Sequence, residues 1–255
     1  MADRGTAATP VLETEALCRN FGGLAAVRDV AISVHQGQLH AVIGPNGAGK
    51  STLVNLLSGA LKPSSGRIHL MGREITGEPA WRMAHLGVGR SFQRTNILGP
   101  LTVLENVRLG VQAVATHWRQ QLRTAASERA LVERAEAILA QVGLAEFRDR
   151  PAATLAHGSQ RQLEIALAIA GHPKLLLLDE PLAGMGPEES ERMIGLLKGL
   201  ARDHAILLVE HDMDFVFAVA DRMTVMVDGA VLAHGSPDEI RASADVQRAY
   251  LGGAE

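Results

Sequence analysis

Short apolar runs punctuate the first third of the chain and predict strands joined by turns. The runs at 25–34, 39–43 and 67–71 are rich in the residue types that favour strands. The turn at 36–38 follows the first run, and the loop at 63–66 precedes the third. This part of the sequence therefore predicts a β-rich region.

The last third alternates between buried strands and helices. The runs at 175–178, 205–209 and 223–227 have almost no polar positions, whereas 188–201 and 215–220 have a helical pattern. Strands without a polar face, separated by helices, are typical of a sheet covered on both sides. The pattern predicts an α/β fold.

The middle third, from about residue 101 to 170, has a helical pattern with few turn signals, and we expect it to be inserted into the sheet. Within it, Ser127 is expected to cap a helix whose apolar positions are Leu131, Ile138 and Val142. Gly143 is expected to end that helix.

Composition narrows the class of protein. Among 255 residues, 47% are hydrophobic and 21% charged, which excludes general disorder, and the net charge of −3 gives no reason to expect a nucleic-acid partner. The single cysteine, Cys18, suits a reducing compartment. The uncharged stretch at 30–49 contains Gly37, Gly44 and Pro45, so we do not expect it to cross a bilayer. A soluble, cytoplasmic chain is expected.

The strongest motif is at residues 44–51, which match G-x-x-x-x-G-K-[ST] in full and follow the apolar run at 39–43. Its glycines let backbone N–H groups converge on phosphate oxygens at a helix N-terminus. Lys50 is expected to pair with the β- and γ-phosphates of ATP, and the Ser51 hydroxyl to ligate Mg²⁺. The expected nucleotide contacts here are Gly44, Pro45, Asn46, Gly47, Ala48, Gly49, Lys50, Ser51 and Thr52.

An acidic pair follows the apolar run at 175–178. Asp179 is predicted to end a buried strand, where its carboxylate can hold the magnesium shell. Glu180 can polarise an attacking water as general base. The loop at Lys50 alone does not distinguish kinases, GTPases and motor ATPases, and the acidic pair narrows the choice towards a nucleotide hydrolase.

With these motifs, the sequence resembles the nucleotide-binding subunits of ABC transporters over nearly its whole length. The resemblance implies that Phe21 stacks on adenine, that Gln93 contacts Mg²⁺ and water, and that His211 contacts the γ-phosphate. The segment at 155–165 resembles the family's signature motif, which completes a partner's nucleotide site in trans. Its expected contacts are Ala156, His157, Gly158, Ser159 and Gln160.

Two positions depart from the family pattern. The signature motif normally has serine where this chain has Ala156, and the loop after Glu180 normally has Asp or Asn where this chain has Gly186. Loss of a hydrogen bond to a charged group costs about 1.5–3 kcal/mol. A site completed by this chain is therefore expected to be weaker, which favours a heterodimer over a homodimer.

The resemblance also implies an organisation and a set of partners. We expect one ABC ATPase domain over 1–255, an α/β fold of the P-loop NTPase type with a mixed sheet core. The nucleotide-binding core and β subdomain are expected at about 1–94 and 172–255, and an inserted α-helical subdomain at about 95–171. The expected partners are a second ABC ATPase subunit, two integral membrane permease subunits and, indirectly, a periplasmic substrate-binding protein. The chain would then lie on the cytoplasmic side of the bacterial inner membrane, bound peripherally.

Phrases at 21–27, 180–185, 235–240 and 245–252 are similar to the larger ATPase of branched-chain or hydrophobic amino acid importers. Urea and amide importers and lipopolysaccharide exporters share this style and remain alternatives. A soluble ABC ATPase without a transport role is disfavoured because Lys50 and Asp179 are only 129 positions apart (179 − 50), which leaves room for a compact helical lobe and no long coiled coil. A degenerate scaffold is disfavoured by the intact motif residues.

Overall fold

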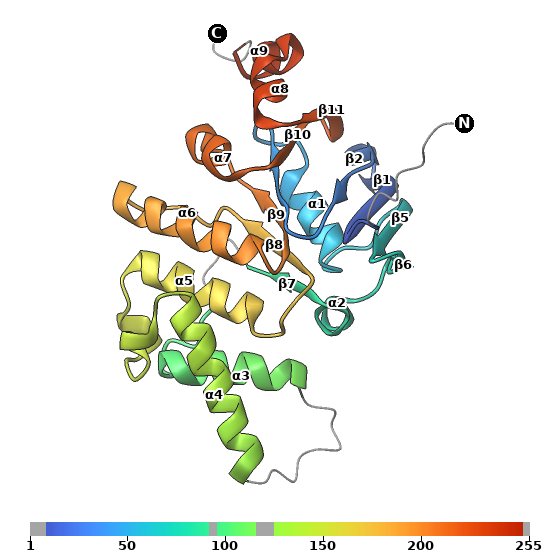
Figure 1. Ribbon diagram of the computed structural model, residues 1–255. Coiled ribbons are helices and arrows are strands. Elements are labelled where there is room, and N and C mark those ends of the chain that lie inside the picture. The colour runs from blue at the N-terminus through green and yellow to red at the C-terminus, as the bar shows by residue number, and fades with distance from the viewer. Residues whose placement is uncertain (1–8, 92–95, 116–124, 252–255) are drawn as a thin grey trace, which may run out of the picture.

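The computed structural model describes residues 9–91, 96–115 and 125–251, which form two sheets with helices around them (Figure 1). The larger sheet has six strands, and all its neighbouring pairs are parallel except the pair of β11 and β10. In spatial order the strands are β11 (Ala230–Gly235), β10 (Arg222–Val227), β4 (Leu39–Ile43), β9 (Ala205–Val209), β8 (Leu175–Asp179) and β7 (Val88–Arg90). The predicted α/β class, with a mixed sheet, is confirmed.

The second sheet is antiparallel and is formed from the first third of the chain. Its strands are β1 (Leu12–Phe21), β2 (Leu24–Val30), β3 (Ser33–Val34), β5 (Ser65–Leu70) and β6 (Arg73–Glu74).

The strand predicted at 25–34 is wrong in one respect, because it is split into β2 and β3. The break lies at residues 31–32, between the end of β2 at Val30 and the start of β3 at Ser33. The Thr14 hydroxyl bridges the break by accepting the backbone N–H of Ile32 at 3.0 Å and donating to the carbonyl of Val30 at 3.1 Å. The interruption is therefore satisfied internally.

The helices lie at different places around the two sheets. Helices α3, α4 and α5 lie together at one end of the molecule, and α1 lies between the two sheets (Figure 1). The helix bounds are α1 (Lys50–Leu57), α2 (Ala80–Leu86), α3 (Val103–Ala115), α4 (Ala125–Gln141), α5 (His157–Ile169), α6 (Pro187–Ala201), α7 (Met213–Val219), α8 (Pro237–Ala242) and α9 (Ala244–Leu251). Short 3₁₀ turns lie at Ala145–Phe147 and Ala152–Thr154. Within the described ranges, no helix has the length and apolar character needed to span a bilayer.

Helix α4 corrects one expectation. Ser127 is not its cap, because the helix already includes Ala125 and Ala126. Gly143 does lie just beyond the helix end, with a left-handed φ of 76°. That conformation suits glycine because it has no Cβ.

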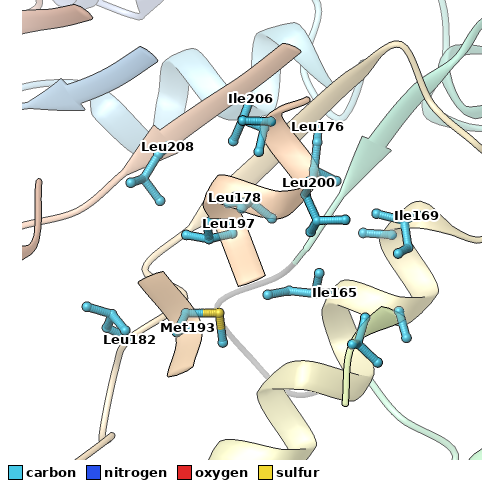
Figure 2. Close-up of a cluster of buried hydrophobic side chains, with 14 of the residues drawn as sticks. Ile165, Ile169, Leu176, Leu178, Leu182, Met193, Leu197, Leu200, Ile206 and Leu208 are labelled. Carbon is cyan, nitrogen blue, oxygen red and sulfur yellow. The ribbon is translucent and has the colours of Figure 1, made fainter. Parts of the chain in front are cut away.

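The core has two layers because the central strands are buried on both faces. On one face, Leu176 and Leu178 of β8 and Leu208 of β9 pack with Leu197 and Leu200 of α6 (Figure 2). On the other face, alternate residues of the same strands pack towards α1 and the antiparallel sheet; these include Leu175, Leu177, Leu207 and Val209. Because both faces are covered, these strands need no polar side and end at a common edge.

Candidate active site

The loop between β4 and α1 begins at the carboxyl end of β4, one of the two central strands of the larger sheet. Gly44 has a φ of 155°, and a Cβ at this position would lie 2.2 Å from the carbonyl oxygen of Met226. Gly49, the N-cap of α1, has a φ of 96°, and its Cβ would lie 2.3 Å from the carbonyl oxygen of Ala26. Only glycine allows the backbone this close at both positions. The loop is thereby held at the edge of both sheets.

Lys50 is folded back onto this loop. Its Nζ donates hydrogen bonds to the carbonyls of Gly44 at 2.7 Å and Pro45 at 3.0 Å. Burial lowers the pKa of Lys50, while the nearby carboxylates of Glu180 and Asp179 act to raise it. The ammonium group is thus positioned inside the loop, next to two acidic side chains.

A cavity of about 460 Å³ opens beside the loop. Loop residues 46–52 line it together with the side chain of Glu180. Phe21, at the end of β1, also lines it and is 44% exposed, and the Arg19 guanidinium lies 4.6 Å from the centre of its ring. The remaining lining residues are Leu24, Ala25, Ala26, Asp228 and Gly229. The exposed Phe21 ring and the loop of the G-x-x-x-x-G-K-[ST] motif, called here the phosphate-type loop, both line this cavity. The cavity therefore fits a nucleotide in size and chemistry.

The acidic pair lies at the carboxyl end of β8. Asp179 is buried, and burial raises the pKa of its carboxyl group, which the nearby Arg90 and Lys50 partly oppose. Glu180 has a left-handed φ of 49°, and its backbone N–H donates to the carbonyl of Val209 at 2.9 Å. A non-glycine residue in this conformation is uncommon and is often found at functional sites. The turn directs Glu180 towards the cavity, away from the strand.

His211 follows β9, the neighbouring strand. Its Nδ1 lies 3.9 Å from Glu180 Oε1, and its side chain is 65% exposed. The structure therefore brings together the phosphate-type loop, Glu180 and His211, which are far apart in sequence. A carboxylate and an imidazole at this distance can handle protons around a reacting water.

The sequence interpretation missed Glu210. This residue ends the apolar run of β9, and its side chain is only 1% exposed. Its Oε1 accepts the backbone N–H of Leu182 at 3.0 Å, and its Oε2 accepts that of His211 at 3.1 Å. Burial raises the pKa of Glu210, and these two hydrogen bonds oppose the shift. An acidic residue directly after a buried strand was the available signal.

The expected signature residues lie elsewhere. Among the described residues, none of positions 156–160 lines the cavity beside Lys50. Ala156 is the N-cap of α5, without a side-chain cap, and Gln160 Nε2 donates to the carbonyl of Leu155 at 3.1 Å. Gly158 and Ser159 border a separate small hollow.

Gly158 and Gly186, both singled out in the sequence, differ in the room that a side chain would have. A Cβ at Gly158 would lie 2.3 Å from the Glu189 carboxylate, so glycine is required unless that side chain moves. At Gly186, in contrast, a Cβ would meet nothing within 4 Å. Gln93 lies outside the residues that the structure describes.

A magnesium ion fits the donor set at the strand edge. Asp179 offers a buried carboxylate, and Ser51 offers a hydroxyl in the first turn of α1, beside the cavity. The unfavourable burial of the Asp179 charge would be relieved by a cation. Oxygen donors of this type are those that Mg²⁺ prefers.

These features define the class: a protein with a mostly parallel sheet, in which a central strand leads through a phosphate-type loop into a helix, is a P-loop nucleotide-binding protein. A sequence model described as "ABC transporter" matches residues 27–183, and one described as "Branched-chain amino acid ATP-binding cassette transporter" matches 230–255. The chain belongs to the ABC transporter ATP-binding family, an ATPase family.

Curated relatives cover the chain almost completely. A high-affinity branched-chain amino acid transport ATP-binding protein of Pseudomonas aeruginosa, BraF, is 42% identical over 252 residues, covering 96% of this chain and 99% of the relative. LivG of Escherichia coli K12, with the same description, is 39% identical over 259 residues, again covering 96% and 99%.

Solved structures share the fold. A nucleotide-free ATP-binding cassette from an ABC transporter superposes with a TM-score of 0.84 at 32% identity, covering 94% of this chain and 98% of the other. A cassette in its ADP conformation gives 0.85 at 31% identity, covering 95% and 99%. A dimeric cassette in a post-hydrolysis state, bound to ADP and Pi, shares the fold at 23% identity with a TM-score of 0.75, covering 89% and 98%.

Proposed function

We propose that this chain hydrolyses ATP to power an ABC importer of branched-chain or other hydrophobic amino acids. The observation that carries the cargo class is the 39–42% identity, over 96% of the chain, to relatives described as branched-chain amino acid transport ATP-binding proteins. The C-terminal match at 230–255 supports the same branch.

The proposed chemistry follows from the residues at the carboxyl ends of β4, β8 and β9. Lys50 and the loop amides bind the β- and γ-phosphates, with Phe21 against the base. Glu180 orients the attacking water as general base, and His211 donates to the γ-phosphate. Ser51, Asp179 and Gln93 would hold Mg²⁺, which, when bound, neutralises phosphate charge.

The proposed assembly is a pair of cassettes arranged head to tail. The cavity beside Lys50 and the hollow beside Ser159 share no lining residue, which supports completion of each site by a second subunit. One solved cassette with the same fold is a dimer. Ala156 and Gly186 lack the polar atoms that the family pattern provides, so a heterodimer whose second subunit supplies a complete signature is favoured.

The proposed permease contact is a mostly apolar groove between the sheet core and the helical group. Its volume is about 260 Å³, and it lies between α2, β7 and the C-terminal half of α5. Met83, Val88 and Leu167 line it, and Trp81 on α2 is 67% exposed. This groove joins the nucleotide core to the helices that carry the expected signature, so a permease segment bound there would sense their relative motion. The chain would accordingly lie on the cytoplasmic side of the inner membrane.

The test is purification of the tagged chain from gently solubilised native membranes, with identification of all co-purifying chains by mass spectrometry. We expect two hydrophobic permease subunits and a second, different cassette. A periplasmic binding protein in the sample, loaded with leucine, isoleucine or valine, would support the cargo class. Recovery with ribosomes or DNA and no permease would contradict a transport role, and a binding protein loaded with urea, an amide or another solute would contradict the cargo class.

A further inference from the structure

A second cavity lies between the two sheets, away from the nucleotide loop. Its volume is about 460 Å³, the same as that of the cavity beside Lys50, and the two cavities share no lining residue. It is lined by Glu13, Thr14, Ala31, Ile32, Ser33, His35, Gln38, His40, Arg222, Thr224 and His234. Histidine and arginine side chains from several elements therefore converge on one space.

Strand register explains why these side chains meet. His40, near the start of β4, pairs with Arg222 of β10, and Thr224 of β10 pairs with His234 of β11. Residues that alternate with them point to the opposite face and belong to the core that packs on α6; these are Ala41, Met223 and Val225. These polar side chains therefore form a cluster at one end of the face of the larger sheet that meets the antiparallel sheet, in place of apolar side chains.

His40 forms the floor of this cavity. It is 5% exposed, and its Nε2 lies 2.8 Å from Thr224 Oγ1. Burial, followed by the nearby Arg222, His234 and His35, lowers the pKa of His40 to about 4. Its ring is therefore neutral at pH 7, and it lies near the guanidinium of Arg222 and the rings of His234 and His35.

The groups around this floor have unused hydrogen-bonding capacity. Within the described part of the chain, the Arg222 guanidinium and the rings of His35 and His234 form no hydrogen bond or ion pair. Glu13 is the one carboxylate among the described lining residues, and it forms no ion pair with Arg222. Glu239 lies near Arg222 and His234, but its carboxylate accepts the backbone N–H of Ser236 at 2.7 Å and does not line the cavity.

We propose that this cavity binds a small molecule through a phosphate or carboxylate group, with Arg222 as the charged partner and His35 and His234 as additional donors. A guanidinium group matches the planar geometry of two oxyanion oxygens. Imidazole N–H groups add donors from β11 and from the turn before β4. The position is distinct from the nucleotide site because it lies at the opposite end of β4, which begins near His40 and ends at the phosphate-type loop.

The test is calorimetric titration of the purified chain with inorganic phosphate, and separately with malonate, after the nucleotide site has been saturated with ADP and Mg²⁺. We expect saturable one-to-one binding of at least one probe. Binding of phosphate alone assigns a phosphate ligand, and binding of malonate assigns a carboxylate ligand. Arg222→Gln should weaken binding about tenfold or more, because it removes a charge-assisted hydrogen bond. Arg73→Gln, on the exposed strand β6, is the matched control and should leave binding unchanged.

A second measurement uses the unmodified chain, so it does not depend on how the variants fold. Probe binding should shift the imidazole NMR signals of His35 and His234, while those of His85 on α2 should not move. Titrations without saturation for both probes would overturn the proposal. Equal affinity in Arg222→Gln and the unmodified chain would also overturn it, as would shifts that are absent from His35 and His234.

Discussion

Substitution of Glu210 tests how the residues at the carboxyl ends of β8 and β9 organise the reaction. Its carboxylate joins the loop after Glu180 to the backbone of His211 through two hydrogen bonds, of 3.0 and 3.1 Å. In Glu210→Gln, one oxygen still accepts an N–H, but the amide NH₂ faces the other N–H and cannot accept it. The substitution therefore removes one hydrogen bond without removing volume.

The expected magnitude follows from this count. One hydrogen bond to a charged group contributes about 1.5–3 kcal/mol. If this energy holds Glu180 and His211 in their reactive positions, its loss lowers kcat about 10- to 150-fold. KM for ATP should change little, because Glu210 does not line the cavity beside Lys50.

The assay is steady-state ATP hydrolysis by the assembled transporter, with thermal unfolding measured in parallel. Glu191→Gln, on the exposed face of α6, is the matched control and should have the activity of the unmodified protein. An unchanged kcat in Glu210→Gln would refute the positioning argument. A lowered melting temperature with unchanged kcat would show that Glu210 serves folding alone.

Three other outcomes are expected. Glu180→Gln should bind ATP normally but hydrolyse it at least a hundredfold more slowly, measured by nucleotide binding and phosphate release, because it removes the proposed base. Ala156→Ser should raise turnover of the assembled complex several-fold if this chain completes a partner's site, and unchanged turnover would contradict the unequal pair. Burial lowers the pKa of His40 from 6.5 to about 4, so its stabilising contribution is present above pH 6.5 and is lost as the pH falls towards 4. This loss should reach about 3 kcal/mol in unfolding free energy, and in His40→Gln the corresponding pH dependence should be absent.

Sequence alone predicted the parts of the fold that short-range pattern determines. The runs at 39–43 and 205–209 match β4 and β9 in both bounds, because fully buried strands carry a continuous apolar signal. The run at 25–34 is divided in the structure at residues 31–32, where Val30 and Ile32 bond to the side chain of Thr14 on β1, which is a tertiary effect. Strands β1 and β11 were missed because their exposed and buried positions do not form a clear run.

The candidate site was predicted where a motif fixes both spacing and context, as for Lys50 and its loop. Glu210 was missed for a physical reason: a single acidic residue after a strand has no distinctive spacing, and its role depends on Leu182, 28 positions earlier. The cluster around His40 was missed similarly, since strand register brings Arg222 beside it across 182 positions (222 − 40). Contacts of this kind depend on topology and leave no local pattern.

The arrangement of β8 and β9 explains how the larger sheet holds the reacting groups in fixed positions. Glu180 is anchored by its N–H to Val209, and Glu210 holds the N–H groups of both Leu182 and His211. The first two of these hydrogen bonds join the ends of the neighbouring strands, and the third holds the backbone of His211 to Glu210. The proposed base and the proposed phosphate contact are thereby fixed relative to each other. The expected signature residues lie on α5, outside this hydrogen-bonded unit. Closure of a cassette pair would therefore bring a second subunit's helix to a preorganised edge, and the energy of ATP binding would be used to join subunits while the reacting groups stay in place.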